Sequence, residues 1–160
     1  MEAVIDPRRA LVPRWRTIIC AVDFTPASAA AARRAAWLAK QLDAGLHLVH
    51  TAYPDQHAGR DLAPGKIFEG ELESLRARLE KERLAAEEVR GAAVETHFTR
   101  GRPADVLASL VREIGGDVLV LGAHGHGRFG EALGSVAGAL ARDPPCTVLL
   151  VRAADGPQPD

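Results

Sequence analysis

Apolar residues in this chain gather in short runs that alternate with longer segments of helical periodicity. Residues 17–22, 46–51, 118–121 and 147–151 are runs rich in leucine and β-branched residues. Such continuous runs are typical of strands that are buried on both faces of a sheet. Residues 94–98 alternate polar and apolar positions instead, and they predict a further strand.

The segments between these runs repeat apolar residues at helical spacing. In the first helix, Thr25 can act as the N-cap and Pro26 fits the first helical position. We expect Gly45 to end this helix, and Trp37 on it to pack in the core or between helix and sheet. Glycine after Arg90 and after Ile114 ends the next two helices. The predicted helices span residues 26–42, 68–90, 103–114 and 136–142.

The alternation of strands and helices predicts an α/β fold. Helical crossovers between consecutive strands favour a doubly wound, mostly parallel sheet of five strands with helices on both faces. In such sheets, ligands bind beyond the carboxyl ends of the strands, where the strand order reverses. Asp23, Thr51 and Gly122 all follow or end a predicted strand. They are therefore candidates for one shared crevice.

A glycine-rich segment follows the strand at residues 118–121 and leads into a helix. Glycines let backbone N–H groups approach an anion closely, and the start of a helix adds partial positive charge, so this order of elements is typical of phosphate binding. Ser135 at the helix start can cap the helix or donate to a phosphate. The glycines are Gly122, Gly125, Gly127, Gly130 and Gly134.

Two common phosphate motifs fit this segment poorly. The Gly-x4-Gly-Lys loop followed by Ser or Thr is absent from the sequence. The string Gly125-x-Gly127-x-x-Gly130 does match the dinucleotide fingerprint, but it follows the fourth strand rather than the first. The next strand also ends at Val151 and Arg152, without the carboxylate that would bind the ribose.

Three segments together resemble the universal stress protein family. They read TIICAVDFTPASAAAARRA, RGRPADVLASLVREIGGDVLVLGAHG and LGSVAGALARDPPCTVLLV, and the resemblance covers residues 17–152. It implies a Rossmann-like sheet of strand order 3-2-1-4-5. It also implies a homodimer formed through the last strand, which begins at Thr147 and ends at Val151, with Leu149 and Val151 at the interface.

The ATP-binding branch of that family carries the signature Gly-x2-Gly-x9-Gly followed by Ser or Thr. In that branch, the glycine loop holds the phosphates and ribose, while residues after the first and second strands hold the adenosine end. The resemblance thus implies ATP, with Mg²⁺, as the ligand. The residues that it assigns to the nucleotide are Ala21, Val22, Asp23, Thr51, Leu121, Gly122, His124, Gly125, Gly134, Ser135 and Val136.

The loop departs from that signature by one residue. Eight residues separate Gly125 from Gly134 in this sequence, where the signature has nine. The flexibility of Gly127 and Gly130 can absorb the difference, or the phosphate cradle can be left incomplete. Two functions therefore stay open: an ATP-binding sensor in a stress response, and a nucleotide-free dimeric interaction module of the same fold.

An enzyme that binds an adenylated or dinucleotide ligand is a third, weaker alternative. No catalytic residue is assigned, because Ser135 lacks the Gly-x-Ser-x-Gly elbow of nucleophilic serines. Efficient ATP hydrolysis needs a positioned water, a metal and a cationic group, so we expect slow hydrolysis at most. No metal site is expected either: His47 and His50 lie three residues apart on a strand and face opposite sides, and His124 and His126 have no suitable ligands nearby.

Composition narrows the class of protein further. The 160 residues suit one domain, expected at residues 15–153, with an N-terminal extension at 1–14 and a polar tail at 154–160. A net charge of −1 without a basic run argues against nucleic-acid binding, and no apolar run is long enough for a membrane span. Cys20 and Cys146 are expected to be buried thiols of a cytoplasmic protein.

Overall fold

The computed structural model describes residues 14–52, 69–123 and 134–153 as a parallel α/β sheet covered by helices on both faces. The strand order is β3-β2-β1-β4-β5, as the family resemblance implies, and every strand pair is parallel, where the sequence predicts a mostly parallel sheet. None of the helices in these ranges is long and apolar enough to cross a membrane. The elements are β1 (Thr17–Ala21), α1 (Pro26–Leu42), β2 (Gly45–Ala52), α3 (Glu69–Arg90), β3 (Glu95–Arg100), α4 (Pro103–Ile114), β4 (Val118–Ala123), α5 (Ser135–Arg142) and β5 (Thr147–Arg152).

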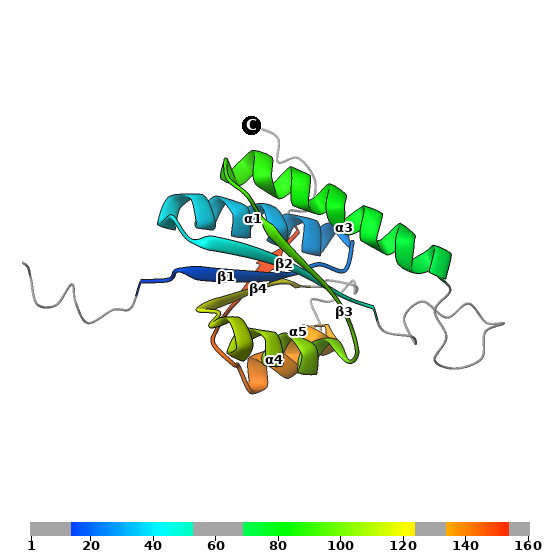
Figure 1. Ribbon diagram of the computed structural model, residues 1–160. Coiled ribbons are helices and arrows are strands. Elements are labelled where there is room, and N and C mark those ends of the chain that lie inside the picture. The colour runs from blue at the N-terminus through cyan, green and yellow to red at the C-terminus, as the bar shows by residue number, and fades with distance from the viewer. Residues whose placement is uncertain (1–13, 53–68, 124–133, 154–160) are drawn as a thin grey trace, which may run out of the picture.

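Strand β1 is the centre of the sheet. Its residue Ile18 pairs with Leu46 of β2 on one side and with Val118 of β4 on the other. Ile18 and Ile19 are both fully buried although they face opposite sides of the sheet. Their burial follows from the helices on the two faces, with α1 and α3 on one side and α4 and α5 on the other (Figure 1).

Helix α1 begins and ends at the residues that the sequence predicts, but another residue than the expected glycine terminates it. The Thr25 hydroxyl accepts a hydrogen bond from the Ser28 N–H at 3.2 Å, and Pro26 is the first helical residue. The helix stops at Leu42 because Asp43 adopts a left-handed conformation with φ of 52° and ψ of 45°. Gly45, the expected end of the helix, is already the first residue of β2. A short polar side chain thus replaces glycine as the helix terminator.

The core face of α1 consists of small residues. Ala31 and Ala35 are fully buried, which lets the helix axis approach the sheet closely. Trp37 lies on the opposite face with Arg33 and Arg34, and 47% of its surface is exposed. The expectation that Trp37 packs in the core or between helix and sheet is therefore wrong, because the alanine face occupies the contact with the sheet.

The two cysteines have different surroundings. Cys20 of β1 is fully buried, and burial raises the pKa of its thiol far above the ordinary value. Cys146, before β5, is only half-buried, so the expectation of two buried thiols is correct for Cys20 alone. Both thiols are free.

Candidate functional site

The carboxyl ends of β1, β2 and β4 lie side by side because these strands are neighbours in the sheet. The helix that follows β1 covers one face of the sheet, whereas α5, the next described element after β4, covers the other (Figure 1). The strand order therefore reverses between β1 and β4. This reversal is where a doubly wound sheet binds its ligands.

Asp23 organises the turn from β1 to α1. One carboxylate oxygen accepts hydrogen bonds from the N–H of Thr25 at 3.0 Å and from its hydroxyl at 2.6 Å. The N–H of Asp23 donates to the hydroxyl of Ser28 at 3.3 Å. Asp23 is nevertheless an exposed residue at the edge where ligands bind. Its structural role in the turn is compatible with contact to a ligand.

His50 and Thr51 tie the end of β2 to its neighbours. The buried ring of His50 lies 4.5 Å from that of Phe24, and its Nδ1 donates to the carbonyl of Val22 at 2.7 Å. The Thr51 side chain is 7% exposed and accepts a hydrogen bond from the Thr99 hydroxyl of β3 at 3.2 Å. Thr51 thus lies at the carboxyl edge of the sheet, as expected, and its hydroxyl is hydrogen-bonded to Thr99 of β3. Sequence reasoning missed the anchoring role of His50, which a histidine inside an apolar strand could have signalled.

Gly122 packs against the start of α1. A Cβ on Gly122 would lie 2.6 Å from the carbonyl carbon of Ala27 and 2.7 Å from the nitrogen of Ser28. Only glycine fits this contact between two backbones. Leu121 before it is buried in the core beneath α4 and α5. Gly122 is therefore needed for the fold, whether or not a phosphate also approaches it.

Helix α5 begins at Ser135, where the sequence predicts the phosphate end of the site. Gly134 is the N-cap and gives no side-chain cap, and Ser135 is exposed. The first N–H groups of any helix have no partner within the helix, and they carry partial positive charge. Val136 packs partly into the core and fixes this helix start on the sheet. His124 and Gly125 lie outside the described residues.

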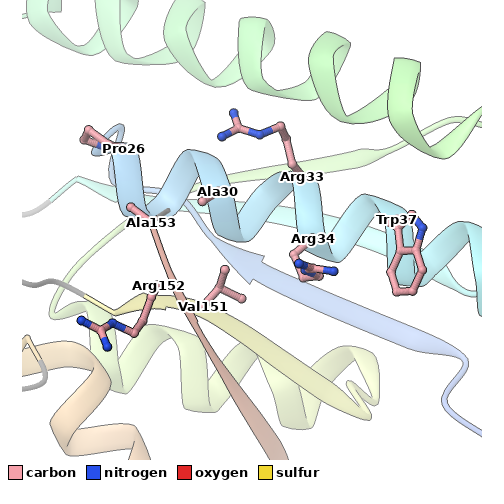
Figure 2. A pocket seen from close by; sticks show the side chains of 8 residues that line it. All are labelled: Pro26, Ala30, Arg33, Arg34, Trp37, Val151, Arg152 and Ala153. Carbon is pink, nitrogen blue, oxygen red and sulfur yellow. The ribbon is translucent and has the colours of Figure 1, made fainter. Parts of the chain in front are cut away.

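A separate hollow of about 390 Å³ lies between α1 and the end of β5. Figure 2 shows Arg33, Arg34 and Trp37 of α1 along one side and Val151 and Arg152 of β5 along the other. None of its lining residues is one of the predicted nucleotide contacts. The hollow therefore belongs to the surface beside β5 and not to the crevice at the strand ends.

Three comparisons place the chain among known proteins. The sequence matches the universal stress protein family over residues 14–152. The fold is similar to UspA from Lactobacillus plantarum, with a TM-score of 0.73 and 21% identity over 88% of this chain and 100% of that chain. No curated protein gives a significant match to the sequence.

Two further similar structures were solved with nucleotides. One is a universal stress protein in complex with cAMP, with a TM-score of 0.68 and 23% identity over 89% of this chain and 100% of that chain. The other is the universal stress protein from Archaeoglobus fulgidus in complex with dAMP, with a TM-score of 0.66 and 21% identity over 87% of this chain and 99% of that chain. At these identities the likeness shows the fold alone, whereas the family match spans every strand from β1 to β5. The chain belongs to the universal stress protein family.

Proposed function

We propose that this protein binds ATP with Mg²⁺ in the crevice at the carboxyl ends of β1, β2 and β4, as a sensing ligand in a stress response. The observation that carries the proposal is the position of the start of α5. This helix start follows the glycine-rich segment, while exposed Asp23 follows the neighbouring strand at the same edge. Relatives solved with cAMP and dAMP support an adenine nucleotide as the ligand class.

The two ends of the site suit the two ends of a nucleotide. The helix start at Ser135 offers N–H groups and partial positive charge, which favour phosphates. Asp23 offers carboxylate oxygens, which accept hydrogen bonds from a ribose or a base. Ala21 and Val22 precede Asp23 in β1 and in the turn after it, and they would line the adenosine side.

Binding of this kind suits a sensor better than an enzyme. The proposal assigns phosphate recognition to backbone N–H groups and a serine hydroxyl, which hold an anion without activating a water. Rapid phosphoryl transfer also needs a positioned nucleophile and a cationic group on the transferring phosphoryl. We therefore expect that any hydrolysis of bound ATP is slow.

A nucleotide-free interaction module is the second candidate. Two observations favour it: the loop between Gly125 and Gly134 is one residue shorter than the family signature, and Gly122 has a packing role that needs no ligand. A module of this kind would keep the fold and act through its surfaces. The two candidates differ in one measurable property, which is affinity for ATP.

We further propose that two copies of the chain pair through β5. This strand is at the edge of the sheet and pairs only with β4 among the described strands. An unpaired edge exposes backbone groups, and pairing across a two-fold axis covers them. Leu150 is 39% exposed on this strand, and the exposed Trp37 lines the same hollow as Val151 (Figure 2). Leu149 and Val151 also lie on this edge strand.

Replacement of Ser135 by glutamate tests the ATP site without disturbing packing. Ser135 is exposed, and a carboxylate at a helix start stabilises the helix through the same charge that attracts phosphate. Ser135→Glu should therefore keep or raise the melting temperature and lose ATP binding through repulsion. Ser109→Glu makes the same change at an exposed position of α4 and should bind ATP like the parent. Equal ATP affinity in Ser135→Glu and the parent would refute the site.

A further inference from the structure

Two histidines and a glutamate converge at the amino-terminal ends of β2 and β3. His47 of β2 pairs in register with Glu95, the first residue of β3, and Val49 pairs with His97. Residues two apart on a strand share a face, so Glu95 and His97 both lie on the side that His47 faces. The cluster is at the opposite end of these strands from the proposed nucleotide crevice.

The distances within the cluster match those between the ligands of one metal ion. His47 Nδ1 lies 3.0 Å from His97 Nε2 and 3.4 Å from Glu95 Oε2. One ligand atom from each of the three residues lies within 4.8 Å of the others. Zinc binds nitrogen and carboxylate oxygen at about 2.0–2.2 Å, so two ligands of a tetrahedral zinc are about 3.4 Å apart. An ion can therefore be accommodated with small side-chain adjustments.

One nitrogen atom of His47 faces two other groups of the cluster. A neutral His47 carries one N–H, yet its Nδ1 faces both the His97 nitrogen and the Glu95 carboxylate. At most one of these two contacts can be a hydrogen bond donated by His47. A cation at the centre would instead accept a lone pair from all three groups.

The surroundings favour the form of histidine that binds metals. Burial lowers the pKa of His47, Arg90 and His97 act in the same direction, and Glu95 opposes them. Arg90 is held nearby by the carbonyl of Ala44 at 2.7 Å, and its charge counts against a cation. The Glu95 carboxylate offsets that charge. Its side chain is 73% exposed, which gives an ion access from solvent.

We propose that His47, Glu95 and His97 form a zinc-binding site, with water as the fourth ligand. Two imidazole nitrogens and a carboxylate oxygen suit a first-row divalent ion of borderline softness and disfavour Ca²⁺ and Mg²⁺, which prefer oxygen ligands. Strand β3 is an edge of the sheet and pairs only with β2 among the described strands. By binding ligands from both strands, the ion would hold the edge strand β3 against β2.

The sequence alone led to the opposite expectation, namely that the chain has no metal site. That expectation considered His47 and His50 as a possible pair of ligands. His50 instead donates a hydrogen bond to the Val22 carbonyl. The partners of His47 come from β3, and only the register between the two strands brings them together. The proposal is independent of nucleotide binding, since it shares no residue with the crevice.

Calorimetric titration of the metal-free full-length chain with ZnCl₂ tests the proposal. The variants His97→Asn and Glu95→Gln each remove one ligand. Removal of a residue that only hydrogen-bonds to a metal ligand already weakens metal binding by about 10–100-fold. Removal of a ligand itself should therefore lower the zinc affinity of each variant by about tenfold or more. Two controls are matched to them: Glu88→Gln on an exposed face of α3, and the double variant His124→Asn/His126→Asn, which removes the other histidine pair. Both controls should bind zinc like the parent.

A second readout separates a metal site from a hydrogen-bonded cluster. Zinc should raise the melting temperature of the parent and of both controls, and should not raise that of His97→Asn or Glu95→Gln. Because the Glu95 side chain is exposed, Glu95→Gln should fold even if His97→Asn does not. Zinc affinity that is unchanged in Glu95→Gln, or lost only in the His124→Asn/His126→Asn variant, would overturn the proposal.

Discussion

Gly122 at the end of β4 lies against Ala27 at the start of α1, so that a Cβ on Gly122 would stand 2.6 Å from the Ala27 carbonyl carbon. The sequence assigns this glycine to a phosphate loop, and the structure adds a packing reason for it. The close contact brings the β4 end and the β1–α1 turn together. Gly122 thereby helps to build the crevice even if it touches no ligand.

Substitution of Gly122 should destabilise the fold. In Gly122→Ala, the new methyl group meets backbone atoms of α1 that cannot rotate away, and overpacking of this kind costs about 1–3 kcal/mol. Urea denaturation measures the loss in the free energy of unfolding. Gly70→Ala on α3 is the control, because a Cβ there meets nothing within 4 Å, and it should leave the stability unchanged or raise it. Equal stability of Gly122→Ala and the parent would contradict the packing role.

The two thiols should react at different rates with a thiol reagent such as DTNB. Burial raises the pKa of both, but Cys20 is fully buried and Cys146 is half-buried. The thiolate is the reactive form, so Cys146 should react slowly in the native protein and Cys20 only after unfolding. In Cys146→Ser, no thiol should react under native conditions. Reaction of Cys20 in that folded variant would show that β1 is less protected than the structure indicates.

Glu87 should make the stability depend on acid pH. Its carboxylate accepts a hydrogen bond from the N–H of Val94 at 3.0 Å and another from Arg83, and these lower its pKa below the ordinary 4.5. A lowered pKa in the folded state gives stability that is present above pH 4.5 and is lost as the pH falls through the folded-state value. Glu87→Gln should thus melt below the parent at pH 7, with a difference that shrinks below pH 4.5.

Melting temperatures between pH 3 and pH 7 measure this dependence. Glu88→Gln, at the exposed neighbouring position, is the matched control and should follow the parent across the range. A constant difference between Glu87→Gln and the parent at all pH values would refute the role of the carboxylate charge.

Pairing through β5 should be sensitive to charge on that strand. Leu150→Glu places a carboxylate on the exposed edge, and a two-fold pair would bring two such carboxylates into one interface, so the dimer should dissociate. Analytical ultracentrifugation measures the change in mass. Leu84→Glu on α3 makes the same substitution at a leucine that is 54% exposed, and it should keep the mass of the parent. A monomeric parent, or a Leu150→Glu variant that keeps the parent's dimeric mass, would contradict pairing through β5.

The order of the elements could be predicted from the sequence because it depends on local signals. Periodicity separates strands from helices, and a Thr25–Pro26 pair marks a helix start whatever its surroundings. The last residue of α1, Leu42, was predicted, but its terminator was not, because the left-handed conformation falls on Asp43, two residues before Gly45. The exposure of Trp37 depends on the rotation of α1, which its buried alanines set.

The site was predictable only in part. The carboxyl ends of β1, β2 and β4 meet because these strands are neighbours in the sheet. The sequence could predict this, since its resemblance to a known family implies the strand order. Contacts between side chains on neighbouring strands depend on the register of strand pairing. The pattern of residues within one segment of sequence does not determine this register. The bond from His50 to Val22 and the approach of His47 to His97 belong to this second kind. Both could be found only once the strands had been placed.

The central claim is that the crevice binds an adenine nucleotide, and calorimetric titration of the purified chain with Mg-ATP tests it most directly. We predict one ATP bound per chain with micromolar affinity, competed by other adenine nucleotides. Absence of binding up to millimolar ATP would contradict the claim and leave the interaction module as the function of this fold.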